Sequence, residues 1–209
     1  MNTPPRFGAI LLAAGRGERY DPLGHNNKLL QTLPDGRLVV AASAQHIFAT
    51  VSVAVAVVRD EDDAVAHVLR AAGCIVTSCL DAADGMGASL AHAARFVQER
   101  FPATQGWLVA LGDMPLVQPA TMQALLARLE SGAGIAVPCF EGRRGHPVAF
   151  DARYLADLAQ LCANEGGRAI LGANPVDYVP VEDRGVVLDI DVPADLNALT
   201  ISACIPRPS

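Results

Sequence analysis

The sequence is poor in aromatic residues, which make up 5% of its 209 positions. Its hydrophobic fraction is nonetheless 51%, so the core must be built from Ala, Val, Leu and Ile. Apolar runs of these residues alternate with helical patterns, which favours an α/β sheet over an all-β sandwich. A chain of this length can bury a sizeable core. We therefore expect one α/β domain over residues 1–209.

An excess of basic residues is also missing, and the formal net charge is -6. General nucleic-acid binders need a basic face that neutralises phosphates, so this class is excluded, although a local arginine cluster can still bind one anion. The apolar segment 7–14 is too short to cross a bilayer and is followed at once by Gly-Arg-Gly-Glu-Arg. We expect a cytoplasmic protein with no membrane partner and a first strand near the N-terminus.

The cysteines lack any paired pattern, since no C-x-x-C motif occurs among the five of them. This absence argues against a disulfide framework and against a zinc ribbon. We expect buried or unreactive thiols in a reducing compartment. The cysteines are Cys74, Cys79, Cys139, Cys162 and Cys204.

The stretch 10–30 carries the first functional pattern. An apolar run of strand length opens into small residues and glycines that carry Arg16, Arg19 and, further on, Lys28. Glycines let a backbone approach a phosphate chain closely, and successive backbone N–H groups with nearby cations bind anions. The stretch predicts a turn that binds phosphate.

Neither generic nucleotide motif fits this turn. The Rossmann fingerprint G-x-G-x-x-G starts with Gly15 and Gly17 but has Tyr20 where the third glycine belongs. A P-loop needs Gly-Lys-Ser/Thr, whereas Lys28 lies well beyond the glycines and is followed by Leu29. The remaining residues must decide which phosphate chemistry is involved.

Strand and helix patterns alternate through the first half of the chain. This rhythm predicts a mostly parallel sheet with right-handed crossovers. The expected strands lie at 51–58, 74–77, 107–111 and 134–138, and the expected helices at 41–50, 61–72, 85–101 and 119–131.

The rhythm breaks in the second half, where residues 141–150 are typical of a hairpin. We expect a small mixed or antiparallel patch there. The pattern predicts helices at 151–162 and 167–171, strands at 176–181 and 186–190, and a last helix that begins at Pro193.

A glycine-rich helix start follows at Gly85, with Gly87 and Ser89 in the first turn. Free N–H groups at such a start can bind an anion. Glycines that merely permit close packing are an equal alternative.

Acidic residues follow two later segments. Asp113 comes just after a strand that looks central, where open α/β sheets bind ligands, although a turn-forming or capping aspartate gives the same pattern. Alternation along an extended chain puts Asp189 and Asp191 on one face. Asp113 with one of these two makes a hard-oxygen pair suited to Mg²⁺ on a triphosphate. Lys28 and the turn arginines would orient that triphosphate for in-line attack, so no residue need be a nucleophile.

Several short motifs together resemble the molybdenum cofactor nucleotidyltransferases, a family of MobA-like NTP transferases, and they occur in the family's order over nearly the whole chain. The motifs are Leu12-Ala13-Ala14-Gly15-x-Gly17-x-Arg19 with Lys28, Gly85-Met86-Gly87-x-Ser89, Gly112-Asp113-Met114-Pro115, Gly145-His146-Pro147-Val148 and Leu188-Asp189-Ile190-Asp191-x-Pro193.

The resemblance implies a three-layer α/β/α, Rossmann-like nucleotidyltransferase fold and Mg²⁺-dependent transfer of a nucleotide to the phosphate of molybdopterin, with release of pyrophosphate. The Ala-Ala-Gly form, through Ala14, is similar to the branch of the family that uses CTP. The implied partners are CTP, a molybdopterin-type cofactor and, transiently, a recipient molybdoenzyme or its chaperone. The implied halves are about 1–115 for the nucleotide and about 116–200 for the acceptor.

The same resemblance implies a role for each matching residue. Arg19, Lys28 and Asp113 would be catalytic, and Asp113 and Asp191 would hold Mg²⁺. The nucleotide would contact Leu12, Ala13, Ala14, Gly15, Arg16, Gly17, Gly85, Ser89 and Gly112. The acceptor would contact Gly145, His146, Pro147 and Arg168.

Three features leave alternatives open. The segment between Arg19 and Lys28 is longer than in the family pattern, which bears on the role of Lys28. His146 either contacts the acceptor or hydrogen-bonds a turn, and Arg168 either binds an anion or is a surface residue after a cap. For the whole protein, the competing hypotheses are a related nucleotidyltransferase with another NTP or a sugar or polyol phosphate acceptor, and a non-catalytic nucleotide- or cofactor-binding adaptor.

Overall fold

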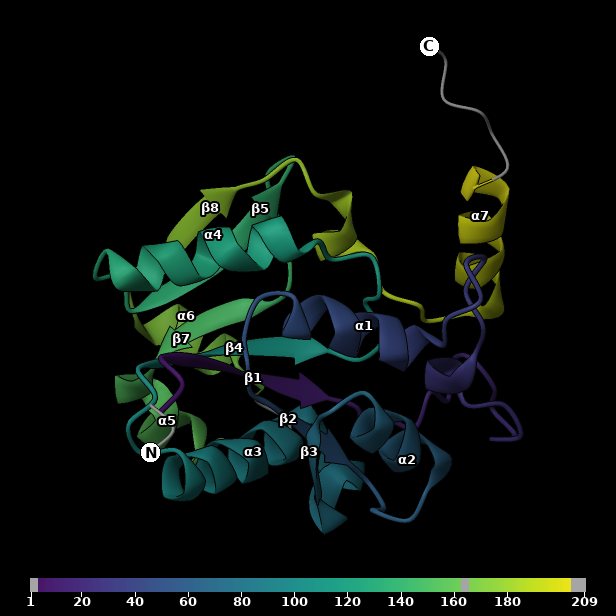
Figure 1. The fold of residues 1–209 in the computed structure, drawn as a ribbon, viewed down its shortest axis with the longest axis horizontal. Helices are drawn as coiled ribbons and strands as arrows, with labels where there is room; N and C mark the ends of the chain where they lie inside the picture. The colour runs from purple at the N-terminus through teal and green to yellow at the C-terminus, as the bar shows by residue number, and fades with distance from the viewer. Residues whose placement is uncertain (1–3, 163–165, 204–209) are drawn as a thin grey trace.

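An eight-stranded sheet organises the chain in the order β3-β2-β1-β4-β7-β5-β6, with β8 paired to β5 (Figure 1). The computed structural model describes residues 4–162 and 166–203. The strands are β1 (Phe7–Leu12), β2 (Ala54–Val58), β3 (Ile75–Ser78), β4 (Gly106–Leu111), β5 (Ile135–Phe140), β6 (Arg143–Arg144), β7 (Val148–Asp151) and β8 (Asp177–Pro180).

Helices connect these strands and cover the sheet. The α-helices are α1 (Val39–Phe48), α2 (Ala64–Ala71), α3 (Met86–Arg100), α4 (Pro119–Glu130), α5 (Leu155–Leu158), α6 (Arg168–Ala173) and α7 (Pro193–Ala203). Short 3-10 helices are η1 (Lys28–Leu30), η2 (Leu80–Asp84), η3 (Ala152–Tyr154) and η4 (Arg184–Val187). None of the helices among the described residues is long and apolar enough to span a membrane.

Strand pairing confirms the predicted sheet. β1 is parallel to β2 and to β4, and β2 is parallel to β3. The antiparallel patch lies in the second half, where β7 pairs with β4 and β5, and β6 pairs with β5. β8 returns parallel to β5.

Two apolar cores lie on opposite faces of the sheet, which makes three layers. Successive side chains of a strand point to opposite faces, so Leu11 joins the core under α1, α2 and α4, while Ile10 joins the core under α3, α5 and α6. Trp107 on β4 is fully buried. A Cβ on the neighbouring residue Gly8 would lie 2.5 Å from the Trp107 ring, so the glycine makes room for the one tryptophan.

Two predicted elements are wrong in detail. Residues 186–190 do not form a strand, because the buried Asp183 carboxylate accepts a hydrogen bond from Gly185 N at 2.9 Å and bends the chain into η4. The helix expected over 151–162 is shortened to η3 and α5, since Asp151 ends β7 and caps η3. In both places a carboxylate that accepts a nearby backbone N–H overrides the apolar pattern.

The cysteine prediction can be followed at four of its positions. Cys74 and Cys79 are buried, and Cys204 lies outside the described residues. Burial raises the pKa of the Cys74 thiol to about 12 and raises that of Cys79 as well. Cys139 is half-buried and Cys162 is exposed, so the expected burial is found at two of the four positions. The two buried thiols are therefore unreactive at neutral pH.

Candidate active site

The site lies at the carboxyl ends of β1 and β4, which are neighbours in the sheet. The chain leaves β1 toward β2 on one side, while β4 lies on the other, so this is the point where the strand order reverses. Open α/β sheets bind ligands at such switch points. A cavity of about 450 Å³ opens here, and Leu12 and Leu111, the last residues of the two strands, both line it.

The loop after β1, which the sequence predicts to bind phosphate, lines this first cavity. Gly17 has φ +64, and its carbonyl accepts hydrogen bonds from Tyr20 N at 2.8 Å and Asp21 N at 3.1 Å. Only a glycine adopts that backbone without strain. The lining residues include Leu12, Ala13, Ala14, Gly15, Arg16 and Gly17.

The long segment before Lys28 is an ordered turn. The Asp21 carboxylate accepts hydrogen bonds from Leu23 N at 2.9 Å and Asn26 N at 2.8 Å. Asn27 then caps η1 by accepting from Leu29 N at 2.9 Å. The segment therefore delivers Lys28 into the cavity as the first residue of η1.

Lys28 lies between two of the predicted metal ligands. Its Nζ is 2.6 Å from Asp113 Oδ2 and 3.0 Å from Asp191 Oδ1, and its side chain is 10% exposed. Burial alone would lower the pKa of Lys28, but the two carboxylates outweigh it and the net pKa is raised. The ammonium group is therefore charged at neutral pH. It is also the only lysine in the sequence.

Arg19 completes the ion-pair network from the loop after β1. Its Nη1 lies 2.5 Å from Asp191 Oδ2, so Asp191 contacts both cations. The position of Asp191 is fixed in turn by Asp195, which accepts hydrogen bonds from Asp191 N at 2.9 Å and Val192 N at 2.8 Å at the start of α7. Figure 1 shows α7 at the edge of the molecule, beside the loop that follows β1.

Three carboxylates meet at this point: ligand atoms of Asp113, Asp189 and Asp191 lie within 4.8 Å of one another. The sequence left open which of Asp189 and Asp191 would join Asp113, and the structure brings both. Carboxylate oxygens are hard ligands of the kind that Mg²⁺ and Mn²⁺ prefer. These three carboxylates fit a divalent cation. In the structure, the positive charges of Lys28 and Arg19 balance part of their negative charge.

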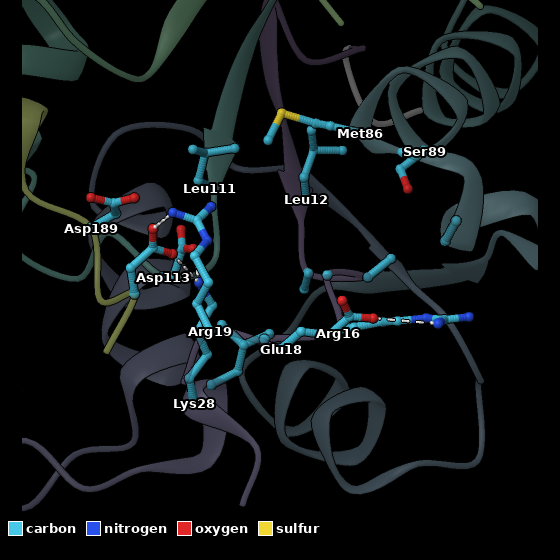
Figure 2. Close-up of a pocket in the computed structure, with 18 of the residues that line it drawn as sticks. Leu12, Arg16, Glu18, Arg19, Lys28, Met86, Ser89, Leu111, Asp113 and Asp189 are labelled. Atoms are coloured by element: carbon cyan, nitrogen blue, oxygen red, sulfur yellow. Dashed lines mark hydrogen bonds and ion pairs between the residues drawn. The ribbon is translucent and has the colours of Figure 1, made fainter. Parts of the chain in front are cut away.

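The start of α3 forms the opposite wall. Gly85, with φ +139, precedes the helix, and Gly85, Met86 and Ser89 line the cavity as the sequence predicted for Gly85 and Ser89. Figure 2 shows Met86 above Leu12 and Ser89 beside it. The additional lining residues Ala82 and Ala83 come from η2 and carry no signal that the sequence could have shown.

Two predicted contacts lie differently from expectation. Gly112 is absent from the lining; its amide donates to the Leu12 carbonyl at 2.9 Å and ties the ends of β1 and β4 together. Arg16 reaches the rim but pairs with Glu18 at 3.4 Å, and Figure 2 shows this pair pointing away from the carboxylates. The turn therefore offers Arg19, rather than Arg16, to the acidic cluster.

A second cavity of about 460 Å³ adjoins the first. The two cavities share Leu12, Gly85, Met86 and Leu111 as a common wall. Of the residues expected to contact the acceptor, Gly145, His146 and Arg168 line the second cavity and Pro147 does not. The lining residues that sequence reasoning missed are Leu90, Val109, Val137, Arg144, Phe150 and Leu171.

His146 lines the second cavity, and its ring is affected by charged groups of both cavities. Its backbone N donates to Val186 O at 2.9 Å, so the turn is held by the main chain, whereas the ring Nδ1 has no hydrogen-bond partner among the described residues. Burial lowers the pKa of His146 and Arg168 adds to this, against the opposing charges of Asp113 and Asp189. The ring is therefore neutral at pH 7.

The comparisons with known proteins agree with this geometry. The model of the MobA-like NTP transferase domain matches residues 9–178. The crystal structure of Rv0371c from Mycobacterium tuberculosis H37Rv superposes with a TM-score of 0.73 at 26% identity, covering 95% of this chain and 100% of that one. A second structure of Rv0371c, in complex with manganese, gives a TM-score of 0.70 at 26% identity over 94% of this chain and 99% of that one. The comparison with curated proteins gave no match.

A more distant neighbour supports the fold alone. A nucleotidyl transferase from Methanothermobacter thermautotroptrophicus gives a TM-score of 0.76 at 22% identity, over 94% of this chain and 97% of that one. The fold and the site together define an enzyme of the nucleotidyltransferase type. The chain belongs to the MobA-like NTP transferase domain family.

Proposed function

We propose that the protein transfers CMP from CTP to the phosphate of a molybdopterin-type acceptor with the help of Mg²⁺ and releases pyrophosphate. The observation that carries the proposal is the cluster of Lys28 with Asp113 and Asp191, which lies where a nucleotide cavity and a second, largely apolar cavity meet. The first half of the chain supplies most of the nucleotide cavity, and the second half supplies most of the acceptor cavity. A cytoplasmic location and transfer of the product to a recipient molybdoenzyme or its chaperone belong to the same proposal.

The nucleotide side of the reaction depends on positioning and charge. The loop of Ala13 to Gly17 would hold the base and phosphates through its backbone, with Arg19 and Lys28 on the phosphate oxygens. Ala14 faces this cavity and is 5% exposed, so its methyl group is part of the surface that would select cytosine.

The three carboxylates would hold the metal ion, with Asp113 and Asp191 as the principal ligands. An ion held there would supply positive charge that offsets the negative charge of the phosphates during transfer. A triphosphate in the cavity would give Lys28 and Arg19 new partners, because phosphate oxygens replace the carboxylates that they now contact.

The acceptor supplies the nucleophile. One of its phosphate oxygens forms a bond to the α-phosphorus of CTP, the bond from that phosphorus to the bridging oxygen breaks, and the electron pair leaves with pyrophosphate. A phosphate monoester is largely ionised at neutral pH, so no side chain has to remove a proton. This agrees with a site that offers cations, carboxylates and glycines but no activated nucleophile near the junction of the cavities.

Pyrophosphate release tests the proposal. CTP, GTP and ATP are supplied in turn with Mg²⁺, with molybdopterin or with a sugar phosphate as acceptor. We expect release with CTP and molybdopterin, and at least a hundredfold loss in Asp113→Asn, because a metal and charge partner is gone. Glu99→Gln, an exposed carboxylate of α3, is the matched control and keeps full activity.

The competing hypotheses predict different outcomes of the same assay. Release with GTP alone would contradict the assignment of base selection to Ala14. Release with a sugar phosphate alone would support the nucleotidyltransferase with another acceptor. Nucleotide binding without release by any combination, unchanged by Asp113→Asn, would identify an adaptor instead.

A further inference from the structure

The side chains of two arginines at the second cavity have no partner within the described part of the chain. Arg144 comes from β6 and Arg168 from the first residue of α6, and both line the cavity. Neither side chain makes an ion pair or hydrogen bond there, whereas Arg6, Arg37 and Arg128, which lie outside this cavity, each pair with a carboxylate. Two unpaired guanidinium groups around one cavity leave a local positive charge on a protein whose net charge is -6.

The walls between these arginines are apolar. Among the described residues that line the cavity, none is acidic. The apolar side chains are Leu12, Leu90, Val109, Leu111, Val137, Val148, Phe150 and Leu171. Such walls give a ligand an apolar surface beside the two exposed arginines.

We propose that Arg144 and Arg168 form a two-guanidinium clamp that selects an acceptor carrying a phosphate monoester on a flat, largely apolar body. The clamp rests on the proposed transfer reaction and adds Arg144 to it as a specificity-determining residue. Guanidinium groups bind phosphate oxygens bidentately, and two of them match the two charges of a monoester.

Charge explains why the clamp belongs on the acceptor side. The reaction brings the acceptor phosphate against the α-phosphate of the nucleotide, and two anions repel each other at bonding distance. The carboxylate cluster with its cations lies in the first cavity, so it acts on the nucleotide. The two cavities share Leu12, Gly85, Met86 and Leu111, so the cavity that carries the clamp adjoins the one that carries the carboxylate cluster.

The walls define the rest of the acceptor. A polyol phosphate would leave its hydroxyl groups against Val109, Val148 and Phe150 without hydrogen-bond partners, which is unfavourable. A planar ring system would bury its faces against the same side chains. The clamp therefore disfavours sugar and polyol phosphates at this cavity.

Binding of a fluorescent analogue tests the clamp separately from turnover. The probes are riboflavin 5′-phosphate, a planar heteroaromatic monoester, uncharged riboflavin, and glycerol 3-phosphate as competitor. We expect the full-length protein to bind riboflavin 5′-phosphate in preference to the other two. Arg144→Gln and Arg168→Gln should each weaken this binding about 10- to 100-fold, the range for a lost charged hydrogen bond.

The chain supplies its own control in Arg143, which precedes Arg144 on the same strand and is not among the lining residues. Side chains alternate along a strand, so Arg143→Gln removes the same charge from the other face. Arg143→Gln should bind the probe like the unmodified protein, and all three variants should keep their affinity for CTP.

Equal losses in Arg143→Gln and Arg144→Gln, or no loss in Arg144→Gln, would overturn the clamp. A parallel loss of CTP affinity in Arg144→Gln would do so as well, since the residue would then serve the nucleotide. Tight binding of glycerol 3-phosphate would contradict the apolar body. If Arg144 governs probe binding but no NTP yields pyrophosphate, the proposed function fails and the clamp stands.

Discussion

Replacement of Lys28 by methionine is the sharpest perturbation of the site, because Lys28 holds two carboxylates together. The unbranched methionine side chain is one atom shorter and fills most of the same volume, so the main change is the loss of the charge. Asp113 and Asp191 are then left facing each other, with side chains 18% and 24% exposed.

The expected cost follows from this burial. Removing one partner of a fully buried ion pair costs about 3–5 kcal/mol. Because Asp191 keeps Arg19 as a partner and both carboxylates retain some solvent, we expect the lower part of that range or less, about 2–3 kcal/mol without metal. For a chain of this size that is a fall in Tm of about 4–12 °C.

Calorimetry with EDTA and then with millimolar Mg²⁺ measures the effect. A divalent cation can replace the missing ammonium charge, so Mg²⁺ should raise the Tm of Lys28→Met more than that of the unmodified protein. Lys28→Arg, which keeps the charge, is the control and should lose less stability in EDTA. An unchanged Tm in Lys28→Met, or an equal response of both proteins to Mg²⁺, would refute the account of this cluster.

Three further outcomes follow from the structure. The only lysine gives a single side-chain signal in lysine-labelled protein, and its NMR titration should show a pKa for Lys28 above the ordinary 10.5, whereas a lower pKa would contradict the ion pairs. A Cβ on Gly145 would lie 2.3 Å from Val186 O, so Gly145→Ala should lower the free energy of unfolding, measured with denaturant, by about 1–3 kcal/mol. An unchanged free energy of unfolding would show that η4 can move to make room for the methyl group. Burial lowers the pKa of His92 below its ordinary value of 6.5, so the unfolded state takes up a proton more readily than the folded state does. The stability linked to the neutral ring is therefore fully present above pH 6.5 and is lost as the pH falls through the pKa of the folded state. His92→Gln, which can still hydrogen-bond Thr77, should therefore flatten the decline in urea midpoint between pH 7 and pH 5, and an unchanged decline would assign it to other groups.

The parts of the fold that the sequence predicted are those with strong local patterns. The apolar run of β1, its glycine loop and the position of Asp113 after β4 all follow from period and turn chemistry. The sequence did not predict η4, which forms around the buried Asp183 carboxylate. That carboxylate also accepts hydrogen bonds from Gln118 N and Thr121 Oγ1, which are far away in the chain, so the local pattern does not show that it is buried.

The candidate site divides in the same way. The glycines and charged residues of the nucleotide cavity lie in short motifs, so a single segment reveals each of them. The apolar walls of the second cavity come from β1, β4, β5, β7, α3 and α6, and any one of those side chains looks like ordinary core in the sequence. The ordered turn that delivers Lys28 depends on Asp21, whose role is visible only through its hydrogen bonds.

The fate of the α-phosphate tests the central claim most directly. CTP labelled at the α-phosphorus is incubated with Mg²⁺, the molybdopterin acceptor and either the unmodified protein or Asp113→Asn. The label should enter a phosphoanhydride with the acceptor in an amount equal to the pyrophosphate released, and Asp113→Asn should abolish both. Label that stays in CTP, or that appears as free CMP whether or not the acceptor is present, would contradict that claim.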